Sequence, residues 1–439
     1  MSNTSETSSV SAPTPPKTFF EYIRSFGPGI IVVLTWLGAG DIVEMSIAGG
    51  NYGYGLMWAG VIAVVIRFLF VSLIAKYQLC NQHGEGVLDG LARLHSIFPF
   101  ALMVAAFVMG HVYCGYMTRG IGECCVNLTG VGTIWIWALG WNVVAMFVVF
   151  KPEFQRIDVL FKVFLVVLSV SFLGTAIWVG PDVGSVFEGV FAFKLPEKRG
   201  DFDPLLVTTG MIGAVGGSLM NLVYPYFLDN KGWNAPEYRR VQTYDLLLAI
   251  LVMILLNASI WTLGAEVLYP TGLTIEGADD LPPLLTKVLG HWAGILVYVG
   301  IFAAIYSSLV GHALGLGYLG SHGFLRWKHG ADAKISDYRR HPCYRWIVIW
   351  CLGSSLIYTA SNMPNFVTLT LLANSAQVIL VPMIAGGVWW ITADARIIGD
   401  KYRNRWWENA LLLFLFCLVI WGAYGAIRAI FGLFSFGAS

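Results

Sequence analysis

The sequence predicts an all-α integral membrane protein. Of its 439 residues, 57 % are apolar and only 12 % are charged, whereas an average soluble domain carries about 25 % charged residues. A chain of this length cannot bury so much apolar surface in one water-soluble core, but lipid can surround it. This composition excludes a soluble enzyme, a nucleic-acid-binding protein and a disordered chain.

Eleven apolar segments are long enough to cross about 30 Å of hydrocarbon as helices. Residues 1–20, rich in Ser, Thr and Pro, are expected to form a disordered cytoplasmic tail, and residues 21–439 a single membrane domain. A turn signal at Asn362-Met363-Pro364-Asn365 separates the ninth span from the tenth. The predicted spans are 27–50, 55–78, 98–118, 131–150, 158–180, 207–228, 243–268, 290–318, 345–361, 365–392 and 407–432.

The charges in the loops predict the orientation of these spans. With the N-terminus in the cytoplasm, most lysines and arginines fall in inner loops, including the pairs Arg239-Arg240 and Arg339-Arg340. An outer loop is acidic around Glu276, Asp279 and Asp280. We therefore expect a protein of a bacterial-type inner (plasma) membrane with an external C-terminus. Arg67 lies inside the second span and counts for neither side.

Glycine clusters interrupt the first and sixth spans. One reads Gly38-Ala39-Gly40-Asp41, and the other runs through Gly216-Gly217-Ser218 to Asn221. Glycine destabilises a helix interior by about 1 kcal/mol relative to Ala, although single glycines also let membrane helices pack closely. Two breaks five helices apart are typical of an inverted-repeat transporter. The repeats would be 27–180 and 207–392, with 407–432 an added eleventh helix.

Acidic residues inside a membrane are costly and usually functional. Asp41 follows the first break and Glu44 is three residues further, so both can share one helical face. They could bind a cation, carry a proton or do both; alternatively, Asp41 could cap the second half of the helix. His111, in the third span, could relay protons or simply be a hydrogen-bonded packing residue.

The segment around the first break resembles the NRAMP (natural resistance-associated macrophage protein) family of metal-ion transporters. Gly27-Pro28, the break and Ala48-Gly49-Gly50-Asn51-Tyr52-Gly53-Tyr54-Gly55-Leu56-Met57-Trp58 follow the family pattern without a gap. The resemblance implies a LeuT-type fold with two repeats of five helices, and proton-linked import of a divalent metal.

The departures from that family lie in the site. The family's DPGN motif falls on Gly38, Ala39, Gly40 and Asp41, so one carboxylate remains, three residues later. The MPH motif falls on Gly217, Ser218 and Leu219, or with a one-residue slip brings Met220 to the His position. A second family His falls on Tyr224, which makes that residue, with Asp41, Glu44 and His111, a candidate for proton coupling. Gln377 keeps the position of a family ligand.

A hard oxygen site is what these residues predict, because carboxylate and carbonyl ligands suit Mg²⁺ or Mn²⁺ whereas sulfur selects softer metals. The expected substrate site comprises Gly38, Ala39, Gly40, Asp41, Gly216, Gly217, Ser218, Asn221 and Gln377, with Asp41 the metal ligand. Gly38 and Gly217 should enlarge the cavity. The alternative is a symporter of a small anion such as bicarbonate, coupled to H⁺ or Na⁺. No HExxH or P-loop motif occurs, so we expect neither an enzyme nor a cofactor. We also expect the transporter to work as a monomer.

Overall fold

The protein is nearly all helix in the part of the chain that the computed structural model describes, residues 14–150, 153–200, 203–205, 207–208, 211–212, 218–272, 274, 286 and 290–436. The helices of the first half are α1 (Phe19–Ser25), α2 (Pro28–Trp36), α3 (Ala39–Tyr52), α4 (Met57–Cys80), α5 (Val87–Leu94), α6 (Ile97–Thr129), α7 (Ile134–Phe150), α8 (Phe154–Leu168), η1 (Ser169–Leu173), α9 (Gly174–Val179) and α10 (Val183–Phe191). The later ones are η2 (Leu219–Val223), α12 (Tyr224–Asn230), η3 (Pro236–Tyr238), α13 (Arg239–Thr262), η4 (Leu263–Leu268), η5 (Tyr269–Thr271), α15 (His291–His329), α16 (Pro342–Ser354), η7 (Ser355–Thr359), α17 (Phe366–Val378), α18 (Val381–Ala393), α19 (Ala395–Ile398), η8 (Asp400–Tyr402) and α20 (Trp406–Phe436).

Several helices have the length and composition of membrane spans. Within the described residues, five continuous helical segments qualify, and the bent pair α2 and α3 makes a sixth. Three shorter apolar helices, Ile134–Phe150, Val381–Ala393 and Trp406–Cys417, fall in further predicted spans. The acidic loop residues Glu276, Asp279 and Asp280, like Gly216 and Gly217, lie outside the described residues.

An outward-facing apolar stripe on α8 and η1 marks a surface suited to lipid. Val159, Val163, Val166 and Val170 follow one another at helical spacing and are each more than half exposed. A water-soluble protein rarely exposes such a stripe, whereas a membrane helix must present one to hydrocarbon.

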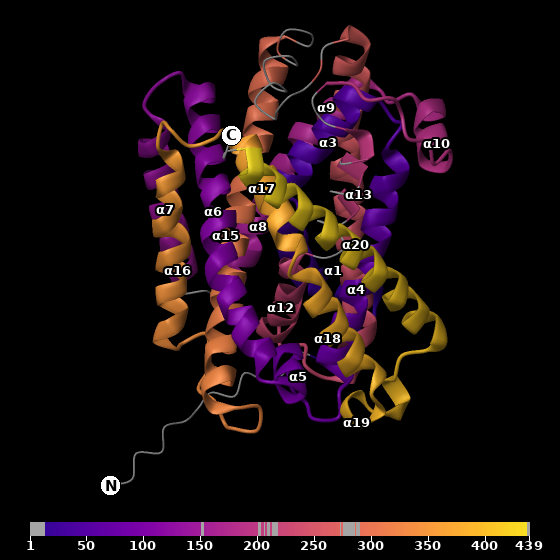
Figure 1. Ribbon diagram of the computed structural model, residues 1–439, viewed down its shortest axis with the longest axis vertical. Coiled ribbons are helices and arrows are strands. Elements are labelled where there is room, and N and C mark those ends of the chain that lie inside the picture. The colour runs from indigo at the N-terminus through magenta and orange to yellow at the C-terminus, as the bar shows by residue number, and fades with distance from the viewer. Residues whose placement is uncertain are drawn as a thin grey trace.

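Two long helices, α6 and α15, form the frame of one side of the bundle. They pack along each other and run most of the length of the molecule in Figure 1, with α7 and α16 beside them. On another side, α20 crosses α17 and α18 obliquely. The short helices α5 and α19 lie at one end of the bundle and α10 at the other. The interrupted helices α2 and α3 pack against this frame, which places their break in the protein interior.

Candidate functional site

The first predicted span is interrupted at Leu37 and Gly38, where α2 ends and α3 begins at an angle of 59° to it. The expectation of unwinding from Gly38 to Asp41 is wrong in extent, because α3 already begins at Ala39 and Asp41 lies in its first turn. Asp41 is not the N-cap residue of that helix; Gly38 holds that position without a side-chain bond. From the first turn, the Asp41 carboxyl group interacts with the backbone N–H group of Gly38.

Side chains of other helices satisfy the backbone groups that the break releases. Ser308 Oγ, on α15, donates to the carbonyl of Thr35 at 2.8 Å. The indole Nε1 of Trp36 donates to the carbonyl of Met220 at 3.3 Å. Met220 lies in η2, a 3-10 segment that begins after Ser218 and leads into α12. This bond ties the break in the first span to the irregular part of the sixth.

A small cavity of about 40 Å³, lined mostly by buried residues, lies at this junction. A water molecule needs about 10–15 Å³ of such space, so the cavity has room for one ion with two or three waters. Its lining comes from six separate parts of the chain: Trp36, Gly38, Gly40, Asp41, Glu44, Arg67, Tyr113, Tyr116, Ser218, Met220, Ser308, His312, Asn374 and Gln377.

The prediction that Gly38 enlarges this cavity is wrong. A Cβ atom on Gly38 would lie 2.4 Å from Ser308 Oγ, and one on Gly40 would lie 2.8 Å from Asn374 Nδ2. These glycines let α15 and α17 approach the break closely, and the neighbouring side chains fill the space. A larger solute is therefore not accommodated in this conformation.

The two acids of α3 line the cavity together, as their spacing predicts. Both are only 6 % exposed. Asn257 Nδ2 lies 3.4 Å from Asp41 Oδ1, and Asn374 Nδ2 donates to Glu44 Oε1 at 3.1 Å. An amide side chain thus contacts each of the two carboxyl groups.

Gln377 extends this polar network from α17. Its Oε1 accepts a hydrogen bond from the Tyr113 hydroxyl at 2.5 Å, and its Nε2 lies 3.4 Å from Asn374 Oδ1. The chain turns at residues 379 and 380, directly after α17, so the tenth predicted span is two helices, α17 and α18. That second break was not predicted.

Two cavity residues have chemistry beyond the amides and carboxylates. Arg67, on α4, is 3 % exposed, and its guanidinium lies 5.0 Å from the centre of the Trp36 ring. His312 Nδ1 lies 2.9 Å from the carbonyl oxygen of Ser308. Because a carbonyl only accepts, this contact requires the proton on Nδ1, and in the neutral ring Nε2 then keeps a lone pair. In the described part of the chain, no three His, Cys, Asp or Glu side chains form a metal-binding group, so any ion here relies on amide and backbone oxygens as well.

Three predicted site residues lie elsewhere. His111 bonds Ser354 Oγ at 2.8 Å and packs on the rings of Trp350 and Tyr358, away from the cavity lining. Tyr224 donates from its hydroxyl to Asp245 at 3.2 Å. Asn221 is buried in η2 but is not among the lining residues.

Asp245, the partner of the Tyr224 hydroxyl, caps the N-terminus of α2. Its carboxylate accepts hydrogen bonds from the backbone N–H groups of Gly27 and Gly29 at 3.0 and 2.6 Å. Tyr224 thus belongs to the anchoring of α2 and not to the central cavity.

Sequence reasoning missed Arg67 and Asn374. Arg67 is the one charged residue in the run from Met57 to Ala75, and an isolated charge in a span is a signal of function. Asn374 precedes Gln377 by three residues, a spacing that places both on one helical face. Ser308 and Tyr113 carry no comparable signal, because single hydroxyl groups are common in helix interiors.

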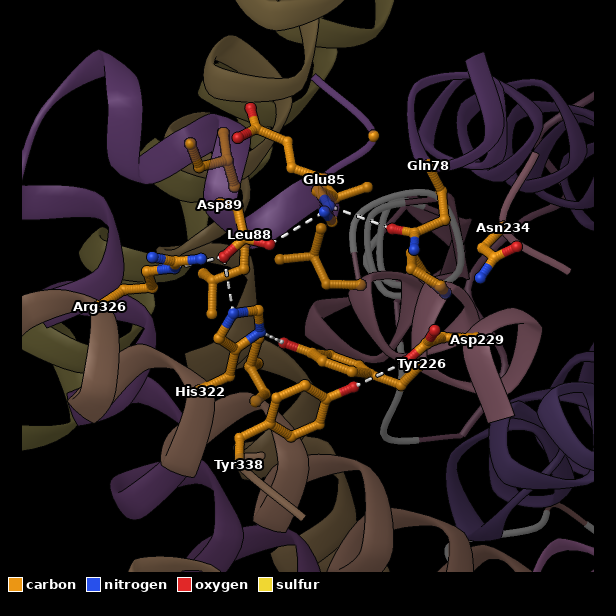
Figure 2. A pocket seen from close by; sticks show the side chains of 17 residues that line it. Gln78, Glu85, Leu88, Asp89, Tyr226, Asp229, Asn234, His322, Arg326 and Tyr338 are labelled. Carbon is orange, nitrogen blue, oxygen red and sulfur yellow. Dashed lines mark hydrogen bonds and ion pairs between the residues drawn. The ribbon is translucent and has the colours of Figure 1, made fainter. Parts of the chain in front are cut away.

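A second, larger cavity of about 320 Å³ opens at the end of the bundle that carries α5. Figure 2 shows Asp89 at the centre of a hydrogen-bond network in this cavity. Asp89 Oδ1 lies 2.8 Å from His322 Nε2 and 2.5 Å from Arg326 Nε. The other ring nitrogen of His322 lies 3.1 Å from the Tyr226 hydroxyl on α12. This network joins α5, α12 and α15, elements that are far apart in the sequence.

Asp89→Asn is expected to destabilise the protein. Burial alone would raise the pKa of the Asp89 carboxyl, but the hydrogen bond from His322 and the charges of His322 and Arg326 outweigh it and hold that pKa below its usual value. A lowered pKa stabilises the fold above the unfolded value of about 3.9, and this contribution is lost as the pH falls through the folded value. Thermal unfolding at pH 7 should show a loss of about 3 kcal/mol that shrinks below about pH 4.

Asp332→Asn is the matched control. Asp332 is an exposed partner of Arg93 near the same network, and exposed ion pairs contribute at most about 1 kcal/mol. Equal unfolding temperatures for the two variants at pH 7 would contradict a structural role for Asp89.

Comparisons with known proteins agree over most of the chain. A family model described as natural resistance-associated macrophage protein-like matches residues 29–427. The divalent metal cation transporter MntH of Bacillus subtilis is 21 % identical over 406 residues, covering 88 % of this chain and 89 % of that protein. MntH of Brucella suis is 23 % identical over 414 residues, covering 88 % and 84 %.

Solved structures show the same fold. A manganese transporter of Eremococcus coleocola, in complex with an aromatic bis-isothiourea compound, superposes with a TM-score of 0.73 at 15 % identity, covering 97 % of this chain and 92 % of that one. A nucleobase-cation-symport-1 family transporter in a closed conformation matches with a TM-score of 0.55 at 13 % identity, covering 92 % and 91 %.

Proposed function

This chain belongs to the natural resistance-associated macrophage protein-like family, and we propose from that premise that it is a secondary active transporter of a hard divalent cation, Mg²⁺ or Mn²⁺. The relatives that match most of its length are named as divalent metal cation transporters. The observation that carries the proposal is the pair Asp41 and Glu44 in a small cavity large enough for one ion.

The ligand set of the cavity favours hard cations. Asp41, Glu44 and the amide oxygens of Asn374 and Gln377 are oxygen donors, which suit Mg²⁺ or Mn²⁺. One soft atom, the sulfur of Met220, also belongs to a lining residue. We propose that these oxygen atoms and retained water molecules coordinate the ion, and that the Met220 sulfur lies near the ion without coordinating it.

The architecture we propose has eleven spans in a bacterial-type inner membrane, with the N-terminus inside and the C-terminus outside. Residues 27–180 and 207–392 form the two repeats, 407–432 an added helix, and the transporter works as a monomer. The breaks at Gly38 and near Ser218 would lie at the bilayer midplane. Import is coupled to protons that move in the same direction as the cation, and Asp41 or Glu44 carries the proton, because these are the two acids that line the cavity.

Uptake into liposomes tests this function. Purified protein in vesicles should import Mg²⁺ or Mn²⁺ down an imposed gradient, and an internal pH dye should report acidification with the metal. Uptake of bicarbonate without either cation would establish the alternative, a small-anion symporter, for which Arg67 in the cavity lining is the one favourable observation. No uptake of any of the three would contradict the proposal.

A further inference from the structure

An arginine lies in the same small cavity as the two acids. Arg67 comes from the middle of α4, and its side chain is almost completely buried. The guanidinium stands over the Trp36 ring, and its Nη1 lies 3.3 Å from the sulfur of Met253. It lines the cavity together with Asp41 and Glu44 and interacts electrostatically with both.

This guanidinium is a permanent charge. An arginine side chain is not deprotonated in proteins, and a buried charge persists only where opposite charges or hydrogen bonds compensate it. Among the described residues that line the cavity, the other ionisable groups that carry charge or can gain it are Asp41, Glu44 and His312. With both acids ionised and His312 neutral, the cavity carries one net negative charge instead of two.

That net charge opposes divalent cations. A divalent ion bound by two carboxylates alone gives a neutral site, whereas with Arg67 present the same ion leaves one uncompensated positive charge in a buried place. Coulomb repulsion grows with the product of the charges and is screened little in the interior. The repulsion acts equally on all divalent ions, so it lowers affinity without choosing between hard and soft metals.

We propose that Arg67 sets the cation affinity of this site: its fixed charge weakens the binding of every divalent cation, so that, of the two cations proposed above, the site serves the more abundant one, Mg²⁺. This inference rests on the proposed transport function. It adds to that function a residue outside the interrupted helices and a reason for the choice of cation.

Calorimetric titration of Mg²⁺ and of Mn²⁺ into the purified full-length chain tests the role of Arg67. Arg67→Met removes the charge but keeps much of the side chain's length, and both affinities should rise by about tenfold or more. Arg67→Lys keeps the charge and should stay within about threefold of the unmodified protein. Lys162→Met removes a positive charge from the partly exposed pair with Asp158 and should change neither affinity.

A second comparison covers the case in which Arg67→Met does not fold, since that variant leaves two buried acids without their counter-charge. In a background of Glu44→Gln, the remaining acid is balanced by Arg67, so this variant should bind either cation only weakly; adding Arg67→Met should raise that affinity, because it restores one net negative charge to the cavity. Unchanged or weaker binding in Arg67→Met, or in the double variant relative to Glu44→Gln, would overturn the role given to Arg67. Absence of binding in the unmodified protein and in every variant would instead overturn the transport function, and the inference with it.

Discussion

Asp41→Asn is expected to reduce cation uptake to the level of empty liposomes while the protein remains folded. Asn has nearly the same shape as Asp, so the contact with Asn257 at 3.4 Å can be replaced by an amide contact. What the variant loses is the negative charge at the centre of the cavity. Because Arg67 already compensates one acid, Asp41→Asn leaves no net charge to attract a divalent ion.

The measurement is uptake of Mg²⁺ and Mn²⁺ by liposomes that contain equal amounts of folded protein, with gel filtration and thermal unfolding as checks of the fold. Glu188→Gln removes an exposed acid that pairs with Lys194 outside the cavity, and this control should transport normally. Normal uptake by Asp41→Asn would show that the ion does not use this carboxylate.

Gly49→Val is expected to prevent folding or to lower the free energy of unfolding by about 3 kcal/mol or more. A Cβ atom on Gly49 would lie 2.4 Å from the carbonyl oxygen of Trp261 and 3.2 Å from the amide nitrogen of Ala265. On the other side of this contact, a Cβ on Gly264 would lie 2.6 Å from the amide nitrogen of Gly50. Here α3 meets η4 backbone to backbone, and neither backbone can yield as a flexible side chain would.

The yield of monodisperse protein and its thermal unfolding check this prediction. Gly140→Ala is the matched control, because Gly140 is also helical, in α7, and a Cβ there meets nothing within 4 Å. That control should be neutral or stabilise the protein by up to about 1 kcal/mol. A Gly49→Val protein as stable as the Gly140→Ala protein would contradict the close contact.

The sequence predicts the family and the helical class well, because both depend on patterns that many residues repeat. The segment that begins Ala48-Gly49-Gly50 carries the resemblance, and Gly49 is needed where α3 touches the end of α13 and η4. The break in the first span was foreseen from Gly38 and Gly40, since clustered glycines weaken a helix. The extent of the break was not predicted, because the residues directly after Gly38 form helical hydrogen bonds again from Ala39 onward.

The interior of the site was harder to predict. A small residue in place of a family ligand suggests empty space at Gly38. The side chain of Ser308, on the neighbouring helix α15, occupies that space instead. His111 has the chemistry of a proton relay but faces Trp350 and Tyr358. Arg67 counts for neither side of the predicted topology, and loop charges alone give it no role, although it lines the cavity beside Asp41 and Glu44.

The location of a bound cation tests the central claim most directly. Anomalous diffraction from crystals of the full-length chain grown with Mn²⁺ would place a heavier stand-in for Mg²⁺. We expect one peak in the cavity lined by Asp41, Glu44 and Gln377, and no peak there in crystals of Asp41→Asn. A peak only in the second cavity, beside Glu85 or Asp229, or a central peak that persists in Asp41→Asn, would contradict the account.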